Sequence, residues 1–202
     1  MAPTPAPTRA NSMQLQPDLP LPDLENVPMK EMLVASSVWP LDEHNQTLLN
    51  NVHPTGWADP TPSKNKYDLV VIGAGAAGLV TSAGAAGVGA RVALIEANLL
   101  GGDCLNSGCV PSKSLIHAAQ LAHSVRNDEF LADSGIKING TVDIDFKKIM
   151  ERVRRVRADI SHHDSAERYT KELGVEVFIG RAKFIDKSTF LTSISTKDLF
   201  AC

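Results

Sequence analysis

The stretch that decides the fold runs from Tyr67 to Asn98 and reads "YDLVVIGAGAAGLVTSAGAAGVGARVALIEAN". Its first part, Asp68 to Ile72, is an apolar run rich in Val and Ile, with the length of a buried strand. A glycine pattern and an Ala-rich run follow, and "ARVALIE" is a second strand-like run that ends at Glu96. This order predicts a β-α-β unit with two parallel strands.

The glycines of this stretch follow the pattern G-x-G-x-x-G at Gly73, Gly75 and Gly78. Gly73 allows a tight turn, Gly75 lets a pyrophosphate approach the backbone, and Gly78 lets helix and strand pack closely. The N-terminus of the following helix offers free N–H groups and the positive end of its dipole. The pattern predicts a dinucleotide site, and a Gly-rich turn in another kind of α/β protein is the alternative.

An acidic residue, Glu96, ends the second strand about 20 residues further on, where it can accept hydrogen bonds from ribose hydroxyls. A carboxylate at this position repels a 2′-phosphate, so the prediction is FAD or NAD rather than NADP. The glycines do not choose between FAD and NAD.

A second motif, "GGDCLNSGCVPSK" at residues 101–113, holds two of the three cysteines of the chain, Cys104 and Cys109. Residues five apart in a regular helix are too distant for a disulfide, so a bridge would need a distorted turn. Glycines and a proline supply the means to distort it: Gly101, Gly102, Gly108 and Pro111.

A helix predicted from about Pro111 to Arg126, with one apolar face, follows the cysteines. That face consists of Leu115, Ile116, Ala119 and Val125. The positive end of the helix and Lys113 are expected to lower a thiol pKa nearby. The local chemistry favours a dithiol that is oxidised and reduced in turn. A metal site with His117 and His123, or two inert buried thiols, are the alternatives.

Composition excludes several classes of function. The 202 residues carry a formal charge of −3, so no overall charge favours nucleic acid or an anionic membrane. No run approaches the roughly 18 apolar residues of a membrane helix. Three cysteines are too few for a secreted disulfide scaffold, and a cytoplasmic location is expected.

The first 65 residues are predicted to be an extension and linker, and residues 66–202 the folded domain. Residues 1–28 contain seven prolines and little apolar periodicity, which predicts disorder. Arg9 and the early Ala and Thr residues leave organelle targeting as an alternative, although acidic residues argue against it. Trp39 and Trp57 are expected to pack this extension on the folded domain.

The second half of the chain predicts ordinary structure. Apolar spacing over residues 144–160 indicates an amphipathic helix whose basic face is expected to be solvated, with a polyanion site as the alternative. The basic residues are Lys147, Lys148, Arg152, Arg154, Arg155 and Arg157. After Gly174, "VEVFIG", "AKFID" and "STFLTSI" predict short strands of a small antiparallel layer.

Together the two motifs resemble those of the flavoprotein disulfide reductases, a family that includes lipoamide dehydrogenase, glutathione reductase and mercuric reductase. The family signature has the form G-G-x-C-x-N-x-G-C-[IV]-P-S-K, and twelve of the thirteen residues here fit it. The exception is Asp103, where the best-known members carry Thr. The resemblance covers about residues 66–196, and the amino-acid sequence of the motifs is most similar to that of mercuric reductase-like members.

The fold that this resemblance implies is α/β: an incomplete Rossmann-like FAD-binding domain, with a parallel sheet, flanking helices and the small antiparallel layer. It places the FAD pyrophosphate at the three motif glycines, the ribose at Glu96 and the flavin ring against the cysteine segment. Cys109 would face the flavin as a charge-transfer thiolate, and Cys104 would be the interchange thiol that meets the substrate. Further FAD contacts would come from Gly102, Lys113 and the backbone of Ala182.

The activity implied is electron transfer from NAD(P)H through FAD and the cysteine pair to Hg(II) or a disulfide. Members of the family are homodimers with a second G-x-G-x-x-G domain and a His-Glu pair, which the sequence lacks. The chain is therefore expected to be an N-terminal portion with little NAD(P)H-driven turnover, weak FAD binding and a tendency to aggregate. The alternatives are a non-catalytic FAD-binding module, part of an enzyme like dihydrolipoamide dehydrogenase or glutathione reductase, and an NAD-dependent dehydrogenase.

Overall fold

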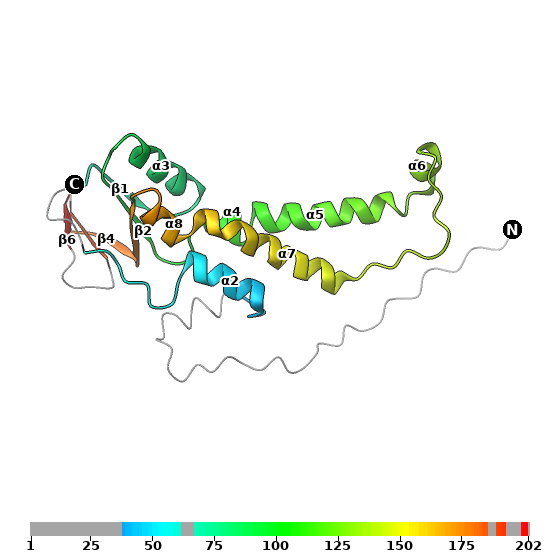
Figure 1. The fold of residues 1–202 in the computed structure, drawn as a ribbon, viewed down its shortest axis with the longest axis horizontal. Helices are drawn as coiled ribbons and strands as arrows, with labels where there is room; N and C mark the ends of the chain where they lie inside the picture. Colours follow the sequence, from blue (N-terminus) through cyan, green and yellow to red (C-terminus); the bar gives the residue numbers. More distant parts are fainter. Residues whose placement is uncertain (1–37, 62–66, 186–188, 193–198, 202) are drawn as a thin grey trace.

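The computed structural model describes residues 38–61, 67–185, 189–192 and 199–201 (Figure 1). Strand β1 (Leu69–Ile72), helix α3 (Ala76–Gly87) and strand β2 (Val92–Glu96) form the predicted β-α-β unit. The two strands pair in parallel, with Leu69 opposite Val92 and Ile72 opposite Ile95. The prediction of disorder for the proline-rich arm concerns residues outside the described part of the chain.

A third strand, β3 (Glu176–Ile179), pairs with β2 in parallel and completes a sheet of order β1-β2-β3. The prediction that "VEVFIG" belongs to the antiparallel layer is therefore wrong. A long helical connection separates β2 from β3, and such a crossover returns the chain in the same direction. The next strands do form a separate antiparallel sheet: β4 (Ala182–Phe184), β5 (Thr189–Thr192) and β6 (Leu199–Ala201).

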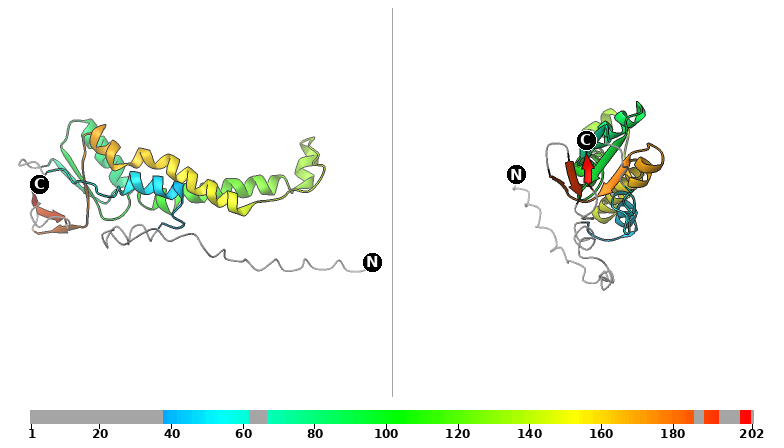
Figure 2. Two further views of the ribbon diagram at one scale, coloured as in Figure 1. Left: turned by 60° about the horizontal axis from the view of Figure 1, so that its bottom comes forward. Right: turned by 90° about the vertical axis from the view of Figure 1, so that its left-hand side faces the viewer.

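The connection between β2 and β3 consists of helices. They are α4 (Gly102–Asn106), α5 (Cys109–Ser124), α6 (Asp128–Asp133), α7 (Phe146–Ser161), the short 3₁₀ helix η1 (His162–Asp164) and α8 (Ala166–Lys171). Helices α5 and α7 lie side by side and extend away from the sheet, with α6 at the far end (Figures 1 and 2). The helix predicted over 144–160 is confirmed as α7, which Asp145 caps by accepting a hydrogen bond from the Lys148 amide.

A helix that the sequence did not predict, α2 (Glu43–Val52), packs along α7 (Figure 2). Asp42 caps it, and its buried residues include Leu48 and Val52. Trp57 packs against the core as expected, and its Nε1 donates to the carbonyl of Val177. The expectation for Trp39 is wrong: its side chain is 64% exposed, because Val38 occupies the core position instead.

The main hydrophobic core lies on one face of the sheet, where β2 contributes Val92 and Leu94 and α2 contributes Leu48. The alternating residues of β2, Ala93 and Ile95, are buried in a smaller cluster on the other face. Burial on both faces is typical of a central strand in a parallel sheet. This arrangement rigidly supports the carboxyl end of β2, where Glu96 lies.

Helices α5, α6 and α7 form the helical arm of the molecule, and α5 differs from its predicted pattern. In α5 the only buried residue is Ser114, while Leu115, Ile116 and Ala119 of the predicted apolar face are exposed. The predicted helix is present, but its apolar face is largely exposed, because α7 packs against the Ser114 side of α5: Arg152 Nη1 donates to Ser114 Oγ at 2.9 Å.

The basic side chains of α7 are also not all solvated, as they were expected to be. Arg154 Nε lies 2.5 Å from Asp42 Oδ2, and Arg157 Nη1 donates to Asn45 Oδ1 at 3.3 Å. The expectation failed because α2 covers this side of α7 and supplies the polar partners. Within the described part of the chain, no helix has the length and apolarity to cross a membrane.

Candidate functional site

The close packing of α3 on β1 depends on the third motif glycine. A Cβ atom on Gly78 would lie 1.9 Å from the carbonyl oxygen of Gly73 and 3.2 Å from Val71 Cγ1. No side chain can occupy this space without displacing the helix. The structure thus gives Gly78 the packing role that the motif predicted.

The N-terminus of α3, which follows the glycine turn, has no side-chain cap among the described residues. Gly75 is the N-cap residue, and the helical hydrogen bonds begin with the Leu79 amide donating to the Gly75 carbonyl. The first amide groups of a helix otherwise have no internal acceptor. Such an end, in a helix of 12 residues, suits a phosphate group.

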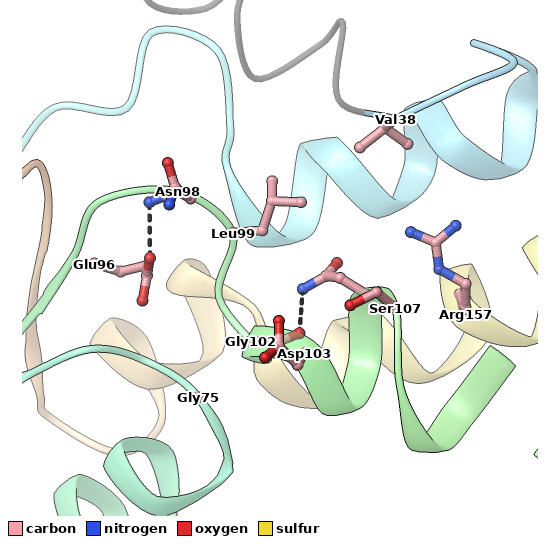
Figure 3. A pocket seen from close by; sticks show the side chains of 10 residues that line it. Val38, Gly75, Glu96, Asn98, Leu99, Gly102, Asp103, Ser107 and Arg157 are labelled. Atoms are coloured by element: carbon pink, nitrogen blue, oxygen red, sulfur yellow. Dashed lines mark hydrogen bonds between the residues drawn. The ribbon is translucent and has the colours of Figure 1, made fainter. Parts of the chain in front are cut away.

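The carboxylate of Glu96 connects the glycine turn with the loop after β2. Its Oε1 accepts a hydrogen bond from the Asn98 amide at 2.7 Å (Figure 3). Its Oε2 accepts one from the Ala74 amide, also at 2.7 Å. A carboxylate oxygen can accept more than one hydrogen bond, so both oxygens retain capacity for a ligand. Glu96 therefore shapes the site through the backbone, a role that its position in the sequence did not reveal.

The start of the cysteine segment lies directly against the glycine turn. A Cβ atom on Gly102, which has φ of +54°, would lie 2.7 Å from the Cα atom of Gly75. Only a residue without a side chain allows the two backbones to approach so closely. This contact brings two motifs that are separated in the sequence to one place.

Two adjoining cavities lie around this contact, and Gly75 and Asp103 line both. The larger cavity, of about 680 Å³, extends past Glu96 and Asn98 to Arg157 (Figure 3). The smaller, of about 600 Å³, lies along the glycine turn and is lined by Gly73, Ala76, Ala77, Gly78, Thr81 and Cys104, among others. Both volumes are within the range of cofactor sites, roughly 300–1,000 Å³.

The two cysteines flank a break between helices. Cys104 lies within α4, Cys109 is the first residue of α5, and Ser107 and Gly108 separate the two helices. Both cysteines are free thiols. The predicted distortion between Cys104 and Cys109 is thus present as a break between two helices.

The proton affinity of Cys104 differs from the expectation. The hydrogen bond with Cys109 is the largest cause that raises the pKa of the Cys104 thiol, and desolvation adds to it. The positive charge of Lys113 acts in the opposite direction but is weaker. The expected lowering of a thiol pKa is therefore wrong for Cys104, because the neighbouring sulfur outweighs the nearby cation.

Two of the other predicted residues, Lys113 and Ala182, are not among the residues that line either cavity. Lys113 is exposed on α5, one turn after Cys109. Ala182 begins β4 and packs partly buried against the cluster that includes Ile95 and Phe178. Sequence reasoning missed Asn98 and Arg157, since a loop residue and one arginine among several on a helix carry no distinguishing signal. In the described residues, His, Cys, Asp and Glu form no group of three suited to a metal ion.

Comparison with known proteins identifies the family. The model of the pyridine nucleotide-disulphide oxidoreductases matches residues 67–199, which run from β1 to the first residue of β6 and include both motifs. The chain belongs to this family. The resemblance to flavoprotein disulfide reductases that the two motifs carry is thereby confirmed at the family level.

Relatives within the pyridine nucleotide-disulphide oxidoreductases include two enzyme classes. The chain is 33% identical over 115 residues to a dihydrolipoyl dehydrogenase of Acholeplasma laidlawii, covering 57% of this chain and 33% of that protein. It is 30% identical over 127 residues to a mercuric reductase of Lysinibacillus sphaericus, covering 63% and 22%. The chain thus spans about a third or less of the length of these relatives.

A solved structure shares the fold. It is the Cu(II) complex of the HOCl-induced flavoprotein disulfide reductase RclA from Escherichia coli, with a TM-score of 0.51 and 28% sequence identity. The match covers 67% of this chain and 26% of that one. The three-stranded parallel sheet with its helices therefore corresponds to part of a Rossmann-like FAD-binding domain.

Proposed function

We propose that this chain binds FAD and uses Cys104 and Cys109 as a redox-active pair that carries electrons from NAD(P)H to Hg(II) or a disulfide substrate. The observation that carries the proposal is the placement of the two thiols on either side of a helix break, with Cys104 in the wall of a cavity that the motif glycines share. On this proposal, residues 66–202 form the FAD-binding part and residues 1–65 an extension.

The residues of the larger cavity fit an FAD adenosine and pyrophosphate. The open N-terminus of α3 and the close approach of Gly75 and Gly102 suit the phosphates, and the Glu96 carboxylate suits ribose hydroxyls. Gly73 and Gly78 would hold the turn, and Lys113 and the Ala182 backbone would add contacts at the two ends of the cofactor. One feature opposes the fit: the Asp103 carboxylate lines the same wall and repels phosphate.

The chemistry of the chain itself is a cycle between a dithiol and a disulfide. When bound, FAD would supply the two-electron transfer that couples NAD(P)H oxidation to reduction of the Cys104–Cys109 bridge. The deprotonated Cys104 then attacks one sulfur of a disulfide substrate, which forms a mixed disulfide and releases one substrate thiolate. Cys109 attacks Cys104 Sγ in turn, which releases the second substrate thiolate and restores the bridge.

Soft sulfur ligands also suit Hg(II), which two thiolates can hold before its reduction. The raised pKa of Cys104 means that either reaction needs a base to remove its proton at neutral pH. The mercuric reductase-like assignment is the one we favour, and a portion of an enzyme like dihydrolipoamide dehydrogenase or glutathione reductase is the alternative.

A second candidate function is FAD binding without turnover. The observation that favours it is the single G-x-G-x-x-G motif in the printed sequence, which leaves NAD(P)H without a motif of its own once FAD occupies the first. On this reading, little or no NAD(P)H-dependent reduction of Hg(II) or a disulfide is expected from the purified chain. Measurable turnover would exclude the second candidate.

The test is an absorption spectrum of the purified chain after FAD loading, before and after one equivalent of dithionite. We expect bound flavin and, on two-electron reduction, a long-wavelength band from a thiolate beside the flavin. The Cys109→Ala variant should bind FAD equally but lose this band, and Cys104→Ala should retain a thiolate beside the flavin. Bound flavin without the band would leave a cofactor-binding module, and no bound flavin would overturn the proposal.

A further inference from the structure

Residues 38–61 precede the part of the chain that matches the family, and they contact the loop 97–101 that follows Glu96. We call these residues the N-terminal strap. The Leu100 amide donates to the carbonyl of Val52 at 3.1 Å, and His53 Nδ1 is hydrogen-bonded to the carbonyl of Asn98. His53 is only 7% exposed. The end of α2 therefore holds the loop 97–101 that follows Glu96.

The strap also lies along the outer strand of the sheet. Trp57 Nε1 donates to the carbonyl of Val177 at 3.2 Å, and Asp59 Oδ1 accepts from the amide of Ile179 at 2.9 Å. Strand β3 is at the edge of the sheet order, so these bonds satisfy polar groups of its free side. With Leu48 and Val52 fully buried in the core, the strap is anchored at several independent points.

A short series of hydrogen bonds leads from the strap to the predicted ribose ligand. His53 holds the carbonyl of Asn98, and the amide of Asn98 donates to Glu96 Oε1 at 2.7 Å. The strap also contributes Val38 to the wall of the larger cavity, at whose far end Arg157 lies (Figure 3). Asn45 of the strap accepts a hydrogen bond from Arg157 Nη1. The position of the Glu96 carboxylate thus depends on a segment outside the matched residues 67–199.

We propose that the N-terminal strap is part of the cofactor site and that His53 is a positioning residue, which holds the loop 97–101 and, through Asn98, the Glu96 carboxylate. The proposal rests on FAD binding as proposed above. An unheld loop would let the carboxylate leave its place, and the free energy of ordering it would then reduce FAD affinity. FAD affinity should therefore depend on a residue that does not touch the cofactor.

The experiment measures FAD affinity and the visible circular dichroism of bound FAD in the full chain and three variants. His53→Ala removes the ring, and His53→Asn keeps an N–H donor near the position of Nδ1. Asp159→Asn is the control, since it removes an exposed ion pair with Arg155 on α7, outside the strap and the cavity walls. We expect His53→Ala to bind FAD about tenfold more weakly, equivalent to about 1.4 kcal/mol, with an altered dichroism band.

His53→Asn should restore most of the affinity and the dichroism, and Asp159→Asn should leave the dissociation constant within about twofold. Unchanged affinity in His53→Ala overturns the proposal but leaves FAD binding in place. Equal weakening in His53→Ala and His53→Asn also overturns it, because that result indicates packing alone. Failure of the unaltered chain to bind FAD overturns both proposals.

Amide hydrogen exchange on the unaltered chain keeps the test independent of how the variants fold. FAD should slow exchange in residues 50–54 as well as in residues 96–102, because the loop and the strap are hydrogen-bonded. Slowing confined to residues 96–102 would overturn the proposal, since the strap would then not respond to the cofactor.

Discussion

The sheet end of the molecule and its helical arm are built in different ways. In the sheet, Leu94 of β2 is 0% exposed and both faces of the strand are covered. In the arm, Leu121 of α5 is 56% exposed and α6 buries only Leu131. The first region is stabilised by the burial of apolar surface, and the second mainly by helical hydrogen bonds and caps. The stability of this chain is therefore concentrated where the cofactor site lies.

The largest expected effect contrasts two leucines. Leu94→Ala should lower the free energy of unfolding by about 4 kcal/mol, because it removes buried methyl groups and leaves a cavity. Leu121→Ala, on the exposed side of α5, should lower it by about 0.5 kcal/mol or less. Urea denaturation followed by circular dichroism measures both, and similar losses in the two variants would contradict the contrast.

The next contrast concerns two glycines of the same helix. Gly78→Ala should destabilise the fold by about 3 kcal/mol, because the new Cβ would lie 1.9 Å from the Gly73 carbonyl oxygen. Gly84→Ala meets no atom within 4 Å and should stabilise the protein by about 0.4–1 kcal/mol. Urea midpoints give the comparison, which fails if both substitutions change stability in the same direction.

The junction between the two regions is tested at Asp42. Burial would raise the pKa of this carboxyl, but the Asn45 amide and the Arg154 guanidinium outweigh it, so the pKa lies below its usual value. Asp42→Asn keeps a good helix cap and removes the charge, so we expect a loss of about 1 kcal/mol at neutral pH.

The sign of the pH dependence follows from the lowered pKa of Asp42. The stability that the carboxylate contributes is present above the unfolded pKa of about 3.9, and it is lost as pH falls through the lower folded pKa. Thermal unfolding of both proteins across this window should show their difference disappearing at low pH. A difference that persists in strong acid would contradict the ion pair as its cause.

A smaller effect concerns the one carboxylate that opposes the proposed cofactor. Asp103→Asn should strengthen FAD binding about twofold to fivefold, because it removes a negative charge from the cavity wall near the phosphates. The advantage should shrink as salt is added. Asp133→Asn, on α6 at the far end of the arm, is the control and should leave FAD affinity unchanged. Fluorescence titration with FAD measures all three proteins.

The smallest change concerns the reactivity of Cys104. Its pKa is raised above the usual value chiefly by the hydrogen bond with Cys109, so Cys109→Ala should lower that pKa. Alkylation of Cys104 by iodoacetamide, followed by mass spectrometry, should then reach its half-maximal rate at a lower pH. Cys109→Ser, which keeps a hydrogen-bonding group, should shift the profile less. An unchanged midpoint in the alanine variant would show that the thiols do not interact.

Local patterns were sufficient for the β-α-β unit and for α7. Runs rich in Val and Ile indicate the two strands. The glycine spacing reflects a tight turn, an uncapped helix N-terminus and the close contact at Gly78, all within one short stretch of sequence. The helix break between the cysteines was likewise predictable from glycine and proline. In each case the interacting groups are near one another in the sequence.

Tertiary structure alone decided the rest. The parallel placement of β3, the packing of α2 on α7 and the partners of Arg154 and Arg157 depend on residues about 80 to 110 positions apart in the chain. The exposed face of α5 and the His53 bond to the Asn98 loop arose in the same way. A sequence pattern shows which side chains must be buried and where the backbone must turn. It does not show which distant segment will pack against them, because that contact depends on the packing of the whole chain.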